Sequence, residues 1–264
     1  MIREIEPCVT VARDSFHPIK GLLACDDPIK PLGVLIEEMR RQLPNRHTKP
    51  VYYHTGIRNL VLITLEVLTG LRRTTLALLD LTHLYMDDGK WVLLVPRGFF
   101  KNADSSFFLV NRIKEDYKNV LPDKFGLYAT LKEYLGDSRP FLMKRYHSRS
   151  RGQALFVKSF RKGLDGTDPE AARLSPEQTS GIYANKLERH VVENRHRGTG
   201  IAKVRRTGLH SVRHVRCMKA IRETGSFKLG GDSIHISEKT ARKHYSRMTT
   251  AERNLEVNKV LFGD

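Results

Sequence analysis

The longest apolar stretch of the chain runs from Asn59 to Thr69 and stops at Gly70. Its length and composition predict a buried helix, because glycine commonly ends a helix and an apolar stretch needs a core around it. Glu66 interrupts the stretch, which is far too short to cross a bilayer. We therefore expect a globular core around this helix, with the segment TGLRR (69–73) where the helix ends.

Further helices are predicted from apolar periodicity and from end signals. Apolar residues recur with helical spacing from Leu32 to Leu43, and Pro44–Pro50 is predicted to be a linker. Ser175-Pro176-Glu177-Gln178 is a capping-box pattern with proline at the first helical position, so a helix should begin at Ser175 and run to about Asn194. The remaining predicted helices are 76–81, 113–121, 127–135, 209–224, 238–245 and an amphipathic helix within 250–262.

Residues 84–110 have a different character. Asp87-Asp88-Gly89 is a turn signal, and the segments Trp91–Val95 and Phe107–Val110 are rich in strand-forming residues. They predict a small antiparallel sheet of two or three strands, with Lys101–Asp104 at a hairpin tip. The predicted fold class is therefore α+β, mainly α, with helices around one small antiparallel sheet.

The charge of the chain indicates a polyanionic partner. Its 264 residues carry a formal charge of +17, and the pI is near 9.9. Basic surfaces gain affinity for phosphate backbones by releasing condensed counterions. Charge alone favours DNA and RNA equally, and a ribosome-associated factor could be as basic. Residues 144–163, with seven Lys/Arg and no acid, and residues 196–208 are predicted to be basic loops or linkers.

The three cysteines, Cys8, Cys25 and Cys217, are isolated in the sequence. This spacing argues against a disulfide framework or a zinc site and fits a reducing cytoplasm. The sequence contains no H-E-x-x-H, Walker A or G-x-G-x-x-G motif. We therefore predict no metal and no other cofactor. Glu4 and Glu6 stand where a signal peptide would have its basic and apolar regions, so the protein is predicted to be cytoplasmic, with no membrane partner.

Two arginines, a histidine and a late tyrosine form a pattern with a definite chemistry. Arg72 follows the helix-ending glycine, His210 and Arg213 form an H-x-x-R pair, and Tyr245 lies thirty-two residues after Arg213. Guanidinium groups bind phosphate bidentately and keep their charge, while a phenol can act as a nucleophile. Each motif alone is weak, since such pairs often lie on a solvated helix face and tyrosines usually pack. The combination predicts phosphodiester cleavage.

At these residues the chain resembles the catalytic domain of the tyrosine recombinases, the phage-integrase family of DNA-cutting and rejoining enzymes. The resemblance covers roughly residues 30–250 and implies the recombinase catalytic fold. It implies that Tyr245 forms a 3′-phosphotyrosyl intermediate while Arg72, His210 and Arg213 hold the phosphate. It further implies site-specific recombination of double-stranded DNA by a homo-oligomer, from dimer to tetramer.

The resemblance also implies two further catalytic positions. The family carries a lysine general acid on a β-hairpin, and Lys101 lies at about the matching interval after Arg72, with Lys90 as the alternative. The family usually has a second His or Trp shortly before the helix of the tyrosine. His235 is the nearest candidate but lies one position early, so either this loop carries an insertion or Ile236 occupies the position and the role is vacant.

Two more positions concern the environment of the first histidine. Thr75 stands three residues after Arg72, where the family tends to have an acid that would orient that histidine. His214 matches a frequent family histidine directly after the second arginine, and we expect a structural role for it.

The predicted organisation is an N-terminal arm or remnant (1–30), a tyrosine recombinase catalytic domain (31–250) and a C-terminal helix or tail (251–264). Full-length recombinases place a core-binding domain before the catalytic one. About seventy residues precede Arg72 here, so we expect a catalytic fragment or a reduced family member. Two rival functions are relaxation of DNA by type IB topoisomerase-like chemistry and non-catalytic DNA binding on the same fold.

Overall fold

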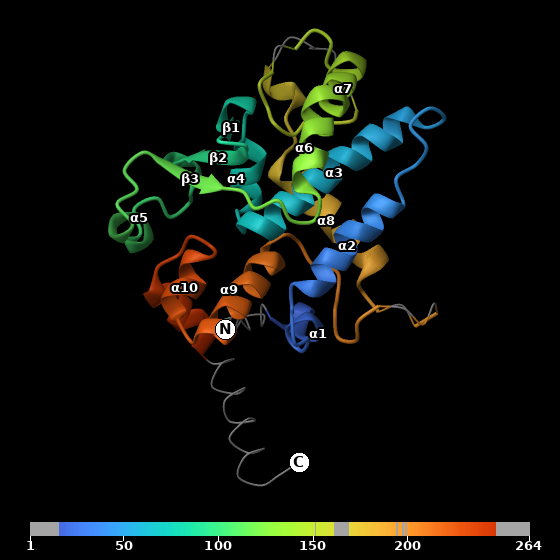
Figure 1. Cartoon of the computed structure of the whole chain (residues 1–264). Coiled ribbons are helices and arrows are strands. Elements are labelled where there is room, and N and C mark those ends of the chain that lie inside the picture. Colours follow the sequence, from blue (N-terminus) through green and yellow to red (C-terminus); the bar gives the residue numbers. More distant parts are fainter. Residues whose placement is uncertain are drawn as a thin grey trace, which may run out of the picture.

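The computed structural model describes residues 16–150, 152–160, 169–193, 195–196, 198 and 200–246 (Figure 1). Helix α3 (Pro50–Thr69) runs through the middle of this part of the chain. Every residue from 57 to 67 is buried, which explains why this stretch is apolar on all sides. The predicted buried helix ending at Gly70 is confirmed, and it begins earlier than its apolar stretch, with a proline at the first helical position.

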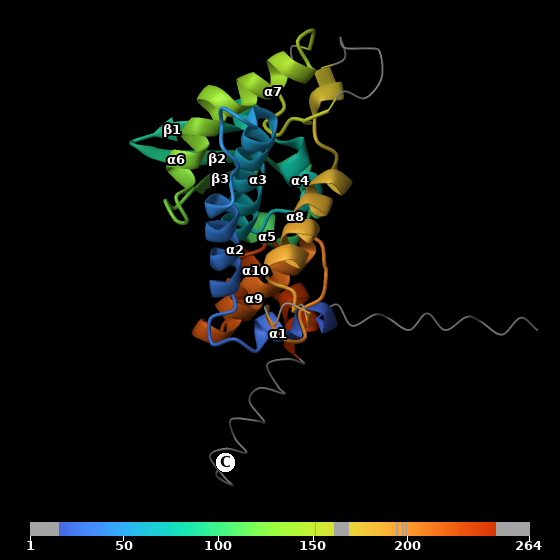
Figure 2. The ribbon, with the colours of Figure 1, turned by 90° about the vertical axis from the view of Figure 1, so that its right-hand side faces the viewer.

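Helices from distant parts of the sequence surround α3. The α2 helix (Lys30–Arg41) and the α8 helix (Pro176–His190) pack on α3 and on each other (Figure 2). The predicted capping box is confirmed, because Ser175 and Gln178 exchange side-chain to backbone hydrogen bonds at the start of α8. The other helices described are α1 (Lys20–Leu23), α4 (Arg73–Leu78), α5 (Ser106–Val110), α6 (Leu127–Glu133), α7 (Arg139–Tyr146), α9 (His210–Thr224), α10 (Phe227–Asp232) and residues 238–246.

Short turns of helix complete the secondary structure. A π-helical turn, η4 (Tyr134–Ser138), joins α6 to α7. The 3₁₀ turns are η1 (His17–Ile19), η2 (Leu81–His83), η3 (Arg97–Phe99) and η5 (Pro169–Ala172).

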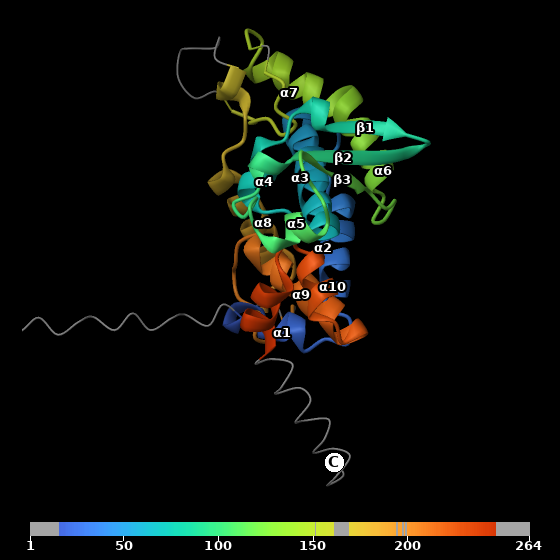
Figure 3. The ribbon, with the colours of Figure 1, turned by 90° about the vertical axis from the view of Figure 1, so that its left-hand side faces the viewer.

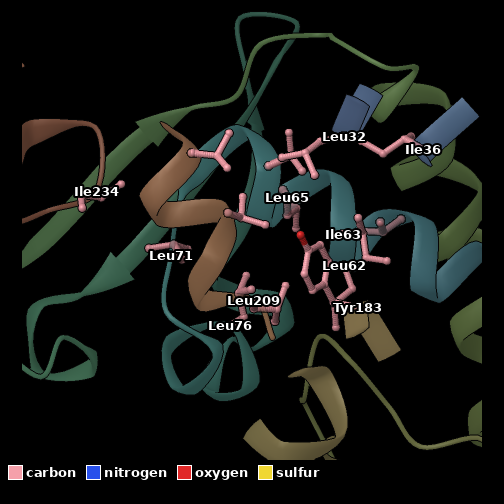
Figure 4. Close-up of a cluster of buried hydrophobic side chains, with 14 of the residues drawn as sticks. Leu32, Ile36, Leu62, Ile63, Leu65, Leu71, Leu76, Tyr183, Leu209 and Ile234 are labelled. Atoms are coloured by element: carbon pink, nitrogen blue, oxygen red, sulfur yellow. The ribbon is translucent and has the colours of Figure 1, made fainter. Parts of the chain in front are cut away.

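The main core forms where α2, α3 and α8 meet the segments that follow α3 and precede α9 (Figure 4). All of the labelled side chains are at most 2% exposed: Leu32, Ile36, Leu62, Ile63, Leu65, Leu71, Leu76, Tyr183, Leu209 and Ile234. Leu71 directly precedes Arg72, and Leu209 directly precedes His210. The same core therefore fixes the backbone beside two of the residues singled out from the sequence.

A three-stranded antiparallel sheet lies at one edge of the molecule (Figures 1 and 3). Its order is β1 (Leu84–Asp87), β2 (Lys90–Pro96) and β3 (Asp116–Val120). Asp88 and Gly89 both have positive φ, 46° and 70°, so the predicted turn between β1 and β2 is confirmed and has the backbone of a tight hairpin.

Two predictions for the segment after β2 are wrong. Phe107–Val110 is not a strand but most of α5, and 113–121 is not a helix but contains β3. In α5, Phe107 and Phe108 are both buried, whereas a strand would point consecutive side chains to opposite faces. The charged segment 116–120 pairs with β2 and alternates between exposed and half-buried residues. Tertiary packing therefore overrides the local preferences of both segments.

The ends of the chain can be compared with prediction only in part. From residue 16 onward the N-terminal segment packs into the molecule, because Ile19, Leu22 and Leu23 belong to the main core. Helix α10 (Phe227–Asp232) was not predicted. The helix predicted within 250–262, and the tail 251–264 that contains it, lie outside the described residues.

Candidate active site

The end of α3 positions the first arginine. Gly70 ends the helix with φ of 63°, and its N–H donates to the Glu66 carbonyl at 2.8 Å. A Cβ atom at Gly70 would lie 2.8 Å from Nε of Arg216, so both the backbone and the close neighbour require glycine here. The chain then leaves in an extended conformation, and Arg72 becomes the residue just before α4.

Asn102 connects Arg72 to the rest of the site. Nη1 of Arg72 donates to Oδ1 of Asn102 at 2.6 Å, and Nδ2 of Asn102 donates to the His235 carbonyl at 2.8 Å. One amide therefore joins the α3–α4 junction, the β2–β3 connection (97–115) and the turn after α10.

Arg213 projects from α9 into the interior and is 2% exposed. Its Nη1 donates to the Gly70 carbonyl, and its Nη2 donates to the Ile234 carbonyl. Burial, together with the charge of Arg72, lowers the pKa of Arg213 to about 10. The guanidinium is therefore charged at neutral pH and is held by backbone carbonyls from two segments.

Tyr245 lies on the helical residues 238–246 and is 2% exposed. Its hydroxyl and Nδ1 of His214 share a hydrogen bond of 2.9 Å, and the ring of Phe16 packs edge-on against it, with centroids 5.5 Å apart. Burial raises the pKa of Tyr245 well above its usual value, while Arg213 and Arg72 act in the opposite direction. The phenol is therefore protonated in this arrangement.

His214 of α9 contacts this phenol, and His210 lies beside His214. Burial, with His210 and Arg213 nearby, lowers the pKa of His214 to about 3. His210 is the first residue of α9, and its side chain is exposed, with its ring centroid 4.6 Å from that of His214. Partial shielding from water and the charges of Arg213 and Arg72 lower the pKa of His210 to about 4. Both imidazoles are therefore neutral at neutral pH.

Lys101 lies in the β2–β3 connection, next to Asn102, and its side chain is exposed. Within the described residues its ammonium has no hydrogen bond or ion pair. Lys90, the alternative, begins β2, whereas the connection leaves the other end of that strand. Seven strand residues separate these ends by roughly 20 Å.

His235 is buried among aromatic rings. Its ring is 1% exposed and packs against Tyr117, Phe100 and Phe107 at centroid distances of 4.7, 5.4 and 5.7 Å. Its backbone has φ of 58°, and its carbonyl receives the Asn102 amide. Ile236 is also buried, at 7% exposed. In this arrangement neither position presents a polar side chain to the surface.

Arg72, Arg213 and Tyr245 thus lie close enough to influence one another electrostatically, and His210 is exposed beside them. Sequence reasoning did not single out Asn102, and it gave His214 only a structural role. A signal for His214 was present, because it lies directly after Arg213. Thr75, at the position where an acid was expected, donates to the Phe99 carbonyl at 2.9 Å.

Within the part of the chain that the structure covers, no group of three or more His, Cys, Asp or Glu side chains is arranged to hold a metal ion. Likewise, no helix in that part is long and apolar enough to cross a membrane.

Comparison with known proteins identifies the fold. No protein-family model and no curated protein sequence matches the chain. Two of the solved structures that match are of the XerH site-specific recombinase. The pre-cleavage complex with difH substrate matches with a TM-score of 0.53 and 18% identity, over 84% of this chain and 50% of that chain. The post-cleavage complex with palindromic difH substrate matches with a TM-score of 0.56 and 16% identity, over 89% of this chain and 52% of that chain. The chain spans about half the length of those recombinase chains. It therefore has the tyrosine recombinase catalytic fold: helices around a small three-stranded antiparallel sheet.

Proposed function

We propose that this chain cleaves and rejoins DNA strands in site-specific recombination, with Tyr245 as the nucleophile. The observation that carries the proposal is the convergence of Arg72, Arg213 and Tyr245, whose charged forms influence one another although the three residues come from separate segments. These residues come from the position just before α4, the first turn of α9 and the helix at 238–246. The likeness to XerH supports the fold on which this chemistry would operate.

The arginines suit the binding of the scissile phosphate. Phosphoryl transfer needs positive charge held rigidly against the non-bridging oxygens. Arg213 is fixed by two carbonyls and Arg72 by the Asn102 amide, so each guanidinium keeps further N–H groups for an anion. None of these hydrogen bonds uses an acid, and their charge remains available to a phosphate. His210, exposed beside them, is a third donor to that phosphate.

The cleavage step moves two protons. Tyr245 is uncovered as the DNA binds, and its phenolic oxygen attacks the phosphorus. Its proton passes to Nδ1 of His214, whose pKa of about 3 in the free protein must rise as the phosphate anion binds beside it. The bond from phosphorus to the 5′-oxygen breaks, and Lys101 protonates that leaving oxygen. The products are a 3′-phosphotyrosyl bond and a free 5′-hydroxyl. Rejoining runs the same steps backward with another 5′-hydroxyl.

Lys101 is favoured over Lys90 by its position in the β2–β3 connection. It directly precedes Asn102, which contacts Arg72, whereas Lys90 lies at the far end of β2. Because Lys101 is exposed, its side chain can reach the leaving oxygen of a bound DNA strand. We assign His235 a positioning role, in which its carbonyl holds Asn102 and its ring anchors the turn.

The substrate proposed is double-stranded DNA, and the working form proposed is an oligomer on that DNA. Because the chain spans about half of the XerH chains, it would grip part of the duplex, chiefly through phosphates. The segment 251–262, which lies outside the described residues, carries apolar residues at helical spacing. We propose that it packs on a neighbouring protomer.

The test uses a covalent trap. Duplexes bound by the full chain are selected from a randomised pool, and versions of each are made with a nick at successive positions. When the nick lies close to the cleavage point, the short fragment released by cleavage diffuses away, so the strand cannot be rejoined. Wild-type protein should accumulate a protein–DNA adduct on a denaturing gel, whereas Tyr245→Phe should bind the same duplex and give none.

Tyr183→Phe and Tyr146→Phe are the matched controls, because each removes one hydroxyl elsewhere. Tyr183 is buried in the main core and Tyr146 ends α7. An adduct that persists in Tyr245→Phe would refute the assignment, and a wild-type chain that binds DNA without any adduct would support the non-catalytic alternative. Relaxation of supercoiled plasmid without exchange between two sites would favour the topoisomerase-like alternative.

A further inference from the structure

A hollow of about 600 Å³ lies between the end of α2, the first half of α3 and the end of α8, away from the candidate active site. Three cations line it: Lys49, Lys186 and Arg189. Tyr52 lies on it and is 70% exposed. None of the residues that line the hollow is an acid.

The net positive charge of the chain does not by itself explain why acidic residues are absent from the lining of this hollow. Another hollow, of about 720 Å³ beside β3, has three cations and three acids in its lining: Arg112, Lys114, Lys118, Glu115, Asp116 and Asp232. The hollow beside α1 and α2 is also mixed, with two cations, Lys30 and Arg41, against Asp27, Glu37 and Glu38. These two hollows therefore contain charges of both signs, whereas the lining of the hollow between α2, α3 and α8 contains only cations.

The three cations converge from different elements and have no counter-ion. Lys49 is the residue before α3, whose N-terminus has no side-chain cap, and Lys186 and Arg189 lie one turn apart on α8. In the described part of the chain none of the three forms an ion pair. Burial and the charge of Arg189 lower the pKa of Lys186. An anion placed among them would gain from all three charges and from the helix terminus.

Uncharged groups in the same lining suit a larger ligand than a bare ion. The hydroxyl of Thr55 is buried and has no hydrogen-bond partner among the described residues, so it can still donate. The exposed ring of Tyr52 offers a flat surface on which a base can stack. A nucleotide carries both a phosphate and a base.

We propose that this hollow binds a nucleotide unit, with its phosphate on Lys49, Lys186 and Arg189 and its base against Tyr52. Along α3 the hollow lies about 25 Å from Arg72, at about 1.5 Å per residue. This is the length of roughly seven base pairs. Two sources meet this distance. A nucleotide of the duplex beyond the cleavage point would offer only its phosphate, because its base stays stacked in the helix, whereas a free nucleotide would offer both its phosphate and its base. The first source rests on the proposed function, and the second does not.

The experiment compares two triple variants of the full chain that remove equal charge. The test variant is Lys49→Gln/Lys186→Gln/Arg189→Gln, and the control is Arg112→Gln/Lys114→Gln/Lys118→Gln in the balanced hollow. Binding of adenosine monophosphate and of inorganic phosphate is measured by calorimetry. Binding of a 12-base-pair and a 30-base-pair duplex is measured across a salt series.

If the hollow binds a free nucleotide, wild type and the control variant should bind adenosine monophosphate, and the test variant should bind it at least tenfold more weakly. Tyr52→Ala should then weaken nucleotide binding but not phosphate binding. If the hollow binds the DNA duplex, no protein should bind the free nucleotide. The test variant should then bind the 30-base-pair duplex at least tenfold more weakly than wild type, with a shallower salt dependence, and should bind the 12-base-pair duplex as wild type does. Nucleotide binding without DNA binding would sustain this site and reject the proposed function. Equal behaviour of test and control variants toward all four ligands overturns the proposal.

Discussion

At the scale of single residues, the candidate site is notable for what holds its arginines. Arg213 is anchored by the Gly70 and Ile234 carbonyls and Arg72 by the Asn102 amide, so neutral groups fix both cations. An acid in these places would orient the side chains equally well but would cancel the charge that a phosphate needs. Neutral anchors therefore combine rigidity with an uncancelled positive potential.

The general acid can be tested through the leaving group. Lys101→Ala should slow cleavage of ordinary DNA by about 100-fold, because the 5′-oxygen must then leave without a proton. The rate should recover largely on a 5′-bridging phosphorothiolate, since sulfur leaves unprotonated. Single-turnover cleavage of the two substrates gives the comparison.

Arg72→Ala is the reference variant for that experiment. It should be impaired on both substrates, because charge stabilisation is needed whatever atom leaves. If Lys101→Ala is equally slow on oxygen and sulfur substrates, Lys101 serves binding, and another group must supply the proton.

The sequence was informative about residues whose role depends on helix ends and short spacing. Arg72 follows a helix-ending glycine, and His210 and Arg213 lie one turn apart on α9, so both placements follow from local pattern. Asn102 could not be found in this way, because its role depends on a contact with His235, far along the chain. The burial of the His235 ring depends likewise on three aromatic residues brought by other elements.

At the scale of elements, the β2–β3 connection is the part that local pattern described worst. Its aromatic segment resembles a strand and its charged segment resembles a helix, yet they form α5 and β3. The reason is non-local: the aromatic residues are needed to cover His235, and β2 needs a second partner strand. The long apolar helix α3, by contrast, was correctly predicted because its burial leaves little alternative.

Asn102, which lies in the β2–β3 connection, should affect the rate of DNA cleavage. Asn102→Ala removes the contact with Arg72 and the contact with the His235 carbonyl, so cleavage should slow by about tenfold or more as Arg72 loses its position. The loss of stability should be only about 1–2 kcal/mol. Cleavage rate and urea unfolding should be measured on the same preparations.

Asn111→Ala provides the matched control on the same connection. Its Nδ2 donates only to the Phe107 carbonyl, at 2.8 Å. This variant should be destabilised to a similar or smaller extent and cleave at nearly the wild-type rate. If both variants lose activity in proportion to stability, Asn102 has no positioning role.

At the scale of the whole molecule, a buried acid makes folding stability depend on pH. Glu66 is fully buried, and neither of its carboxyl oxygens has a hydrogen-bond partner among the described residues. Burial raises its pKa from the usual 4.5 to about 8, although Arg213 and Arg216 oppose the rise. The folded state therefore holds this proton more tightly than the unfolded state does.

The sign of the effect follows from that difference. The contribution of Glu66 is complete below about pH 4.5 and is lost as pH rises through about 8. Relative to Glu66→Gln, which cannot titrate, the wild-type free energy of unfolding should fall by roughly 1.4 kcal/mol per pH unit across this range. Urea unfolding at several pH values measures it. Exposed Glu115→Gln should run parallel to wild type, and a parallel curve for Glu66→Gln would contradict the prediction.

The burial of Tyr245 has a consequence for chemical labelling. A phenol that is 2% exposed and protonated is hidden from electrophilic reagents in the solvent, whereas Tyr52, at 70% exposed, is open to them. Any rearrangement that carries Tyr245 to a phosphate must first uncover it. The rate at which Tyr245 reacts with a tyrosine-selective reagent would therefore report how often the molecule adopts a conformation in which this phenol is exposed.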